Sequence, residues 1–221
     1  MAPPSVLGNG LTMGMYGEIV ELTVGMGRDR ETLKVHKGVI CHYSGYFDKA
    51  LNGGFKEATT GKILLPEEQV GLFKRLIHWL YTGKIEVDSP DFTQGSIVCR
   101  LWGLADRRAI PLLMNMCIDT LRDRIALTWN VPSNGTLNMV YESTIPGSLL
   151  RAFLADVIAK TGANPMLSTP ECNADLLKNL LLLVWDMNAS VDRLSQKEFA
   201  DMSVCPYHRH EAGVSCSKKK V

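Results

Sequence analysis

Extended, alternating patterns of apolar and polar residues lie early in this chain and are short. They cover Glu18–Gly25, Thr32–Val35 and Gly61–Leu65, and a further short strand is expected after Gly83. The first two flank the turn sequence GMGRDRE, which predicts a β-hairpin. Because strands do not alternate regularly with helices, the pattern disfavours an open parallel sheet with a ligand pocket at its strand ends. The Gly-x-Gly pair of the turn lacks the third glycine and the helix that a nucleotide loop needs.

Helical periodicity dominates the rest of the chain. Apolar residues at positions 70, 73, 76, 77 and 80 form one stripe of a helix that ends at Gly83. Pro66 suits the first turn of that helix, and the two glutamates after it favour its positive end. Two more helices with apolar faces are expected over residues 97–105 and 110–121.

Beyond Arg124 the loop WNVPSNG predicts a domain boundary. Three segments with apolar faces follow it, over residues 137–141, 149–160 and 176–188. Thr169 is the expected N-cap of the third segment, with a proline and a glutamate behind it.

Composition narrows the classes of partner. The chain has 221 residues, of which 46% are hydrophobic, and a net charge of +1, so we expect neither nucleic acid nor membrane as a partner. The first ten residues lack the features of a secretory signal, and the apolar run LLLLVW is far shorter than a membrane span. Six scattered cysteines indicate reduced thiols in an intracellular protein, cytoplasmic or nuclear, rather than a disulfide framework.

The segment VHKGVICHYSGYFDKALNGGFKEATTGKILLPEE, residues 35–68, combines histidines, a cysteine, aromatics and glycines. Together with FKRLIHWLYTGKI behind it, this segment resembles a BTB/POZ domain of the type abundant in filamentous fungi. The matching motifs are Val35-His36-Lys37, Ser44-x-Tyr46-Phe47, Gly54-Phe55-x-Glu57, Leu65-Pro66-Glu67, Trp79-Leu80-Tyr81-Thr82-Gly83, Leu104-Ala105-Asp106 and Ile110-Pro111-x-Leu113.

The resemblance implies an α+β fold, in which a small sheet flanks a helical cluster, over residues 17–125. Residues 126–200 resemble the helical extension that often follows this domain in fungal members, so an all-α segment is expected there. We expect residues 1–16, rich in proline and glycine, to be disordered, and residues 201–221 to form a polar tail with cysteines and histidines.

The resemblance also implies a non-catalytic protein-interaction module, commonly a homodimer and in many members an adaptor for a cullin-type ubiquitin ligase. In those adaptors a hydrophobic-x-Glu trio contacts the cullin, and Phe55 and Glu57 occupy its place here. The alternative is that Phe55 covers the core and Glu57 is solvated. Because no kelch, MATH or zinc-finger repeat is visible, the helical C-terminal half would have to recruit the substrate.

Relatives often place an acidic residue at the start of the first strand and a basic residue after the histidine, at the base of a dimer groove. Glu18 and Lys37 match these positions, with glutamate in place of the more usual aspartate. The alternative is two ordinary surface charges. Met13, Met15 and Tyr16 precede the strand and are candidates to cover a partner.

The thiols and imidazoles of residues 35–68 do not have the spacing of a catalytic or metal site. His36 and His42 are six residues apart rather than four, and Cys41 directly precedes His42. Adjacent residues diverge by about 100° around a helix, so Cys41 is interpreted as a buried small residue. The aromatics that follow are interpreted as packing residues of the core or a dimer face. The rival interpretation is a thiol-dependent enzyme, with the candidates Cys41, Cys99, His42 and His78.

The end of the chain holds one metal-like pattern, Cys205-x2-His208-x-His210-x5-Cys216. Two thiolates and two imidazoles satisfy a tetrahedral zinc ion. The His-x-His spacing, however, places the two rings on opposite sides of an extended chain unless a turn intervenes. The tail resembles tails that follow fungal BTB domains, and the alternative is a disordered polar tail. The basic end, Lys218–Lys220, is interpreted as a solubility feature.

These observations favour a protein that self-associates through a BTB domain and serves as a scaffold, with a ligase-adaptor role as the sharper version. The alternative is a dimerising transcriptional co-regulator, which differs from the adaptor in its partner. We expect no required cofactor, apart from the candidate structural zinc in the tail.

Overall fold

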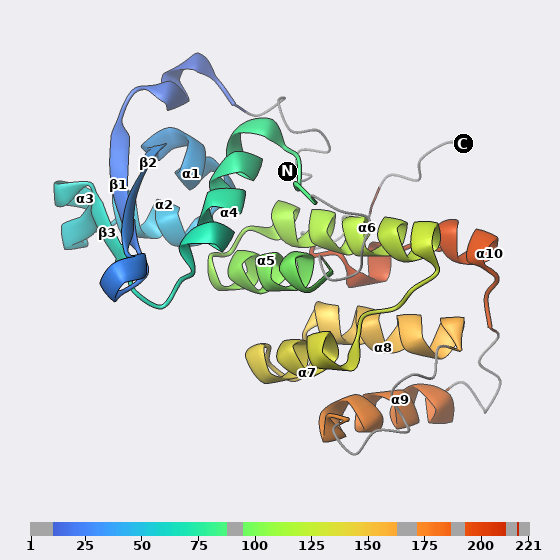
Figure 1. Ribbon diagram of the computed structural model, residues 1–221. Helices are drawn as coiled ribbons and strands as arrows, with labels where there is room; N and C mark the ends of the chain where they lie inside the picture. Colours follow the sequence, from blue (N-terminus) through green and yellow to red (C-terminus); the bar gives the residue numbers. More distant parts are fainter. Residues whose placement is uncertain (1–10, 88–94, 163–171, 187–192, 211–215, 217–221) are drawn as a thin grey trace. The chain divides into compact units, whose positions relative to one another are not determined.

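The computed structural model describes residues 11–87, 95–162, 172–186, 193–210 and 216 (Figure 1). The chain divides into two compact units, Met1–Glu86 with Leu104–Met114 and Val87–Gly103 with Asn115–Val221. All described strands belong to the first unit, and the described elements of the second are helices. This α+β composition, with helices after the sheet-containing part, confirms the predicted fold class.

The sheet of the first unit has three strands in the order β2-β1-β3. Strands β1 (Ile19–Val24) and β2 (Glu31–His36) form the predicted antiparallel hairpin. Its loop contains two glycines with positive φ, Gly25 at +81° and Gly27 at +59°, so the Gly-x-Gly pair serves the turn. Strand β3 (Lys62–Leu65) pairs with β1 in parallel, so the crossover from β2 to β3 carries the chain past β1 from one edge of the sheet to the other.

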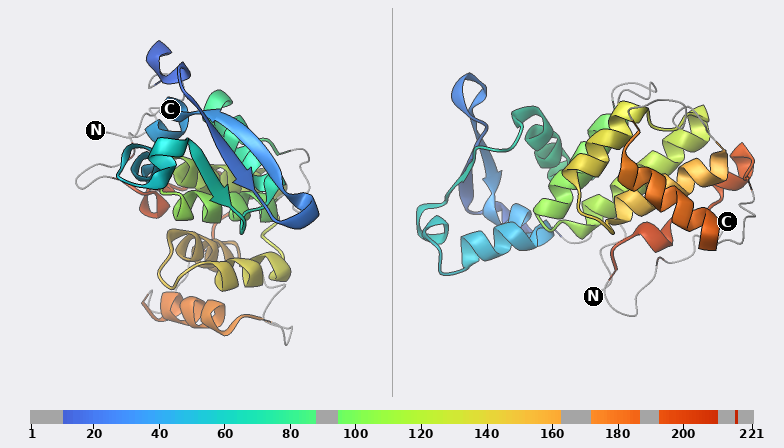
Figure 2. Two further views of the ribbon diagram at one scale, coloured as in Figure 1. Left: turned by 90° about the vertical axis from the view of Figure 1, so that its left-hand side faces the viewer. Right: turned by 90° about the horizontal axis from the view of Figure 1, so that it is seen from below.

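The two faces of the sheet differ in chemistry. Apolar side chains alternate onto one face, where they are buried. They are Val20, Leu22, Val24, Leu33, Val35, Ile63 and Leu65. The other face is mainly polar, and Glu21 stands on it with its carboxylate 3.2 Å from Lys62 Nζ and 4.0 Å from Lys34 Nζ. Figure 2, left, looks onto the sheet from this side.

The helices of the first unit lie in the segments that connect or follow the strands. The crossover from β2 to β3 contains α1 (Lys37–Tyr43), α2 (Gly45–Asn52) and α3 (Lys56–Thr60). After β3 comes α4 (Val70–Thr82), which buries Phe73, Leu76, Trp79 and Leu80 along one side. Gly83 ends α4 at φ +71°, as the sequence predicts.

The junction between α1 and α2 explains the Ser44 motif. Ser44 is fully buried, and its hydroxyl caps α2 by accepting the N–H of Phe47 at 3.1 Å. The same hydroxyl donates to the carbonyl of Arg108 at 2.5 Å, and the next N–H, of Gly45, donates to the carbonyl of Ala109 at 3.1 Å. The chain after α5 (Gly95–Arg107) is therefore hydrogen-bonded to this junction.

The start of α4 differs from the sequence prediction. The helix begins at Val70 rather than at Pro66, and the residues between them form a turn. The cause is Glu68, which lies in the interior instead of serving the end of the helix. Its carboxylate accepts bonds from Arg107 Nη2 at 3.0 Å and Arg108 Nη2 at 2.7 Å. The predicted strand after Gly83 is also wrong, because residues 83–87 form no strand.

Arg108 joins this cluster to the aromatic motif. Its guanidinium lies over the ring of Tyr46, 4.5 Å from the centroid, while it also binds Glu68. Charged groups are almost never buried unless they are paired, and here the carboxylate has two cationic partners. One buried anion therefore fixes the turn before α4 to the segment that follows α5.

The second unit is a set of helices with serine caps. Ser133, Ser148 and Ser195 each accept a backbone N–H in the first turn of the following helix. The expected N-cap Thr169 lies outside the described residues, and Asn173 Oδ1 accepts the N–H groups of Asp175 and Leu176. The helices are α6 (Pro111–Thr128), α7 (Asn134–Ser143), α8 (Leu149–Thr161), α9 (Ala174–Asp186) and α10 (Gln196–Ala200). Helix α6 runs past the predicted boundary at residue 125, and helix α10 is not among the predicted segments.

We expect Glu68→Ala to lower the free energy of unfolding by about 3 kcal/mol, because it leaves two guanidinium groups without their shared carboxylate. Urea denaturation followed by circular dichroism measures the change. Glu67→Ala is the matched control: Glu67 is exposed, so its loss should cost no more than about 0.5 kcal/mol. Equal effects of the two substitutions would show that the buried pairing of Glu68 contributes no specific stability.

Candidate interaction surfaces and metal cluster

The residues predicted to form a dimer groove meet at the start of the sheet. Lys37 Nζ lies 3.2 Å from the carboxylate of Glu18, and the N–H of Lys37 donates to the carbonyl of Glu18 at 2.8 Å. The lysine side chain is mostly buried and the glutamate is exposed. Glu18 also lines a hollow of about 450 Å³, together with Ile19, Glu21, Lys34, Thr59, Thr60, Gly61 and Lys62.

The residues that precede β1 form a short ordered helix. The disorder expected for residues 1–16 is contradicted at Met13–Tyr16, which form a 3-10 helix (η1), and residues 1–10 lie outside the described residues. Gly38 allows η1 to approach α1, since a Cβ there would stand 2.6 Å from Met15 Cα. Met13 is 91% exposed, and Tyr16 and Ile19 are exposed as well. Three apolar side chains thus lie open between residues 13 and 19, the stretch that contains Glu18.

Phe55 and Glu57 lie at the start of α3. Phe55 occupies the N-cap position of this helix and is 61% exposed, so it does not cover the core. Glu57 follows in the first turn and is half-buried, with the exposed Lys56 between them. An exposed aromatic beside a carboxylate combines an apolar anchor with an orienting charge, which is the chemistry of an interaction hot spot.

Cys41, the cysteine of residues 35–68, is a packing and hydrogen-bonding residue. Cys41 Sγ lies 3.6 Å from the carbonyl oxygen of Phe47, to which it donates. Burial, followed by the charge of Asp48, raises the pKa of Cys41 to about 11, which keeps the thiol protonated at neutral pH. His42 sets its ring edge-on to Tyr43, with centroids 4.7 Å apart. Cys41 and His42 therefore do not form the activated pair that a thiol enzyme needs.

The other cysteine and the other histidines considered for a thiol enzyme are also held by burial, hydrogen bonds or ring contacts. Cys99 is buried within α5, and burial raises its pKa to about 12. His78 Nε2 lies 3.3 Å from a carboxylate oxygen of Glu86. His36 Nδ1 lies 2.8 Å from the hydroxyl of Tyr81, and its ring meets that of Tyr16 edge-on. The imidazoles are engaged in packing and hydrogen bonds.

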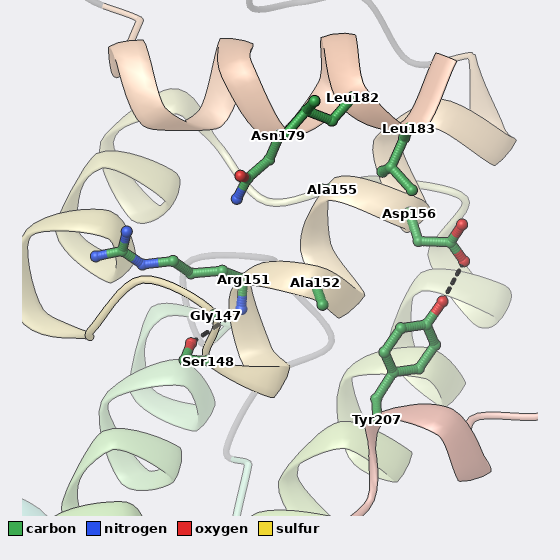
Figure 3. A pocket seen from close by; sticks show the side chains of 10 residues that line it. All are labelled: Gly147, Ser148, Arg151, Ala152, Ala155, Asp156, Asn179, Leu182, Leu183 and Tyr207. Carbon is green, nitrogen blue, oxygen red and sulfur yellow. Dashed lines mark hydrogen bonds between the residues drawn. The ribbon is translucent and has the colours of Figure 1, made fainter. Parts of the chain in front are cut away.

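A cavity of about 280 Å³ lies between α8 and α9 of the second unit (Figure 3). Its two ionic side chains, Arg151 and Asp156, are occupied by neighbouring protein groups. Arg151 donates to the carbonyls of Tyr141 and Thr144, and Asp156 accepts from the hydroxyl of Tyr207. The remaining lining is mainly apolar or small, so this cavity offers little chemistry to a substrate.

Helix α9 leaves many of its apolar side chains exposed. Leu176 is buried, but Trp185 is 78% exposed and Leu177, Leu181 and Leu182 are exposed as well. The sequence carried a signal of this, because LLLLVW places apolar residues all around a helix rather than on one stripe. Among the described residues, these side chains of α9 therefore form an exposed apolar surface.

The predicted metal ligands converge in the C-terminal segment. Donor atoms of Cys205, His210 and Cys216 all lie within 4.8 Å of one another. His210 Nε2 stands 3.4 Å from Cys205 Sγ and 3.3 Å from Cys216 Sγ, and His208 Nδ1 stands 3.0 Å from Cys216 Sγ. A 3-10 turn, η4 (Cys205–Tyr207), precedes the histidines. The structure thus brings all four residues together.

Partners of this cluster come from parts of the second unit that are distant in the chain and carry no recognisable motif. Asp119 of α6 places a carboxylate oxygen 3.6 Å from His208 Nε2. Asn115 of α6 binds the backbone of Arg209 twice, accepting its N–H at 2.7 Å and donating to its carbonyl at 3.0 Å. Burial, followed by the charges of His210 and Arg122, lowers the pKa of His208 to about 4, so this ring is neutral.

Comparison with protein-family models matches residues 16–124 to the BTB/POZ domain. The match includes the three strands, helices α1–α5 and most of α6, and over these residues it confirms the BTB/POZ domain that the motifs predict. Domains of this family are generally interaction modules. Helices α7–α10 lie beyond the matched residues. Among the helices that the structure describes, none has the length and apolar character to cross a bilayer.

The raised pKa of Cys41 predicts slow alkylation with a distinctive pH profile. Its rate should keep rising about tenfold per pH unit from about pH 8 to about pH 9.5, because the thiolate fraction is far from saturation. Quantitative mass spectrometry of the iodoacetamide-labelled peptide measures this rate, with glutathione as the reference thiol. A rate for Cys41 that levels off near about pH 8 would indicate an activated thiolate and contradict its structural role.

Proposed function

Because residues 16–124 are a BTB/POZ domain, we propose that this protein acts by binding other polypeptides, and that it first binds a second copy of itself. The proposal continues with a scaffold role, in which the surface at Phe55 and Glu57 docks a cullin-type ubiquitin ligase. The observation that carries the proposal is the exposure of apolar side chains at both surfaces in the single chain.

Self-association is supported by the environment of β1. Met13, Tyr16 and Ile19 expose apolar surface in the stretch that contains Glu18, whose carboxylate pairs with Lys37 and which lines the hollow with Ile19. Burying such side chains against a partner is favourable by about 1.5–3 kcal/mol for each one that becomes fully covered. The mostly buried Lys37 supplies a fixed charge at the base of this surface, which favours one orientation of the partner.

The adaptor role is supported by the position of Phe55. A short helix presents this ring to solvent, and the glycine pair before it, Gly53 and Gly54, gives α3 an entry separate from α2. Glu57 stands in the first turn of the same helix, so its carboxylate and the ring share one small element. A partner with an apolar pocket and a basic rim fits this chemistry.

A dimerising co-regulator of transcription is the alternative within the same class. It shares the self-associating surface at β1 but has no use for a cullin contact at Phe55. Binding of a cullin therefore separates the two functions, whereas self-association is common to both.

We expect the protein to sediment at about 10 µM as a species of twice the 24.4 kDa chain mass. Met13→Asp should weaken this association at least tenfold, since a charge replaces an apolar contact and about 1.4 kcal/mol corresponds to tenfold. Met26→Asp is the control, because Met26 is also an exposed methionine but lies in the hairpin loop. A single species of chain mass for the parent would refute self-association.

Phe55→Ala should weaken binding of a purified cullin by about thirtyfold, the effect of losing an aromatic hot spot worth about 2 kcal/mol. Biolayer interferometry with immobilised cullin measures the affinity. Leu127→Ala, at an exposed leucine near the end of α6, controls for general surface hydrophobicity. If parent and Phe55→Ala bind equally, or neither binds, the adaptor role is lost while the self-association result stands.

A further inference from the structure

The Cys/His cluster has the arrangement of a metal centre rather than of a polar surface. In a tetrahedral zinc site, bonds of about 2.3 Å to sulfur and 2.0–2.1 Å to nitrogen place neighbouring donors about 3.3–3.8 Å apart. The sulfur-to-nitrogen distances in the cluster are 3.0, 3.3 and 3.4 Å. Three donors surround a common point, and His208 reaches the group through Cys216.

The choice of ring nitrogen removes the objection that the His-x-His spacing raises. His208 directs Nδ1 toward the cysteine sulfur, whereas His210 directs Nε2. The two rings are 5.8 Å apart and inclined by 62°, so they approach the sulfurs from different directions. One ring uses its near nitrogen and the other its far nitrogen, which lets residues two apart serve one centre.

The ring nitrogens that face away from the sulfurs are buried as well. The side chain of His208 is 6% exposed, and its Nε2 has no hydrogen-bond partner. His210 Nδ1 is likewise buried without a hydrogen bond. Leaving buried polar atoms unpaired costs free energy, so these two outward nitrogens require partners in the shell around the cluster. Asp119, 3.6 Å from His208 Nε2, has the place of the carboxylate that orients a metal-bound histidine.

We propose that Cys205, His208, His210 and Cys216 bind one zinc ion. Two thiolates and two neutral imidazoles suit zinc, and they exclude magnesium and calcium, which take oxygen ligands. Binding displaces the two thiol protons to solvent. The residue set leaves no coordination position for a substrate, so the site is structural.

The metal holds the C-terminal segment on the helices of the second unit. That segment is already hydrogen-bonded to α6 through Asn115 and to α8 through the Tyr207–Asp156 contact. Arg122 of α6 adds a bond to the carbonyl of Met202 at 3.2 Å. Zinc adds a cross-link between residues 205 and 216, so that the chain beyond η4 is held against these contacts.

A Cys205–Cys216 disulfide is the competing use of the two sulfurs. It would not require either imidazole, yet His210 Nε2 lies within 3.4 Å of both sulfurs. The N–H of Cys216 also points to Cys205 Sγ at 3.3 Å, the kind of hydrogen bond that supports a metal thiolate. The geometry therefore favours the metal.

The test is elemental analysis of the full chain purified under reducing conditions. We expect about one zinc ion per chain in the parent and at least a fivefold loss in Cys205→Ser and in Cys216→Ser. Cys172→Ser is the matched control, because Cys172 is a partly buried cysteine outside the cluster, and its zinc content should equal that of the parent. Circular dichroism checks that each variant is folded.

Cobalt substitution of the unmodified chain keeps the proposal testable if the variants misfold. Cobalt added to the metal-stripped protein should give the visible bands of tetrahedral cobalt and a sulfur-to-cobalt charge-transfer band, and zinc should abolish both. A chain that carries no zinc and gives no such bands overturns the proposal. A Cys205–Cys216 disulfide found by peptide mapping under the same reducing conditions also overturns it.

Discussion

The buried carboxylate of Glu68 is the interaction on which the first unit depends. An anion in the interior requires partners, and Arg107 and Arg108 supply two. Because Arg108 also stacks on Tyr46 and accepts the Ser44 hydroxyl at its carbonyl, the charge pairing and the cap of α2 share one residue. The turn before α4, the start of α2 and the chain after α5 are thereby fixed to one another, and the sheet packs its apolar face on a defined helical cluster.

The first unit buries some of its aromatic side chains and exposes other apolar side chains at its surface. Tyr43, Phe47 and Trp79 are buried in the first unit, whereas Met13 and Phe55 are exposed at its surface. Burial raises the pKa of Cys41, which makes its thiol a packing group and a hydrogen-bond donor. The groups that the single chain leaves open are apolar anchors beside charges, and such groups suit recognition of another polypeptide.

Local pattern was enough to predict most elements. Alternation identified β1 and β3, and the spacing of Phe73, Leu76 and Leu80 identified α4 with its end at Gly83. The start of α4 was not predictable, because it is set by arginines about forty residues away in the chain. Helix α10 did carry a local signal, the capping box of Ser195 and Glu198, but its apolar content is too small to show periodicity.

The candidate sites divide in the same way. Residue types and spacing were enough to identify the two cysteines and two histidines of the tail as candidate ligands. They could not show which ring nitrogens face the sulfurs. Asp119 and Asn115 could not be found from sequence, since they lie on α6, far from the tail in the chain. The exposure of Phe55 likewise depends on the direction of the chain between α2 and α3, which cannot be predicted from hydrophobic periodicity.

Hydrogen–deuterium exchange at two protein concentrations tests most directly whether polypeptide covers the exposed apolar surface. At about 100 µM, relative to about 1 µM, amides of residues 13–20 should gain protection, while those of α3 should not, because α3 lies outside the proposed self-association surface. Equal deuterium uptake in residues 13–20 at both concentrations, with the mass of a single chain throughout, would contradict the account.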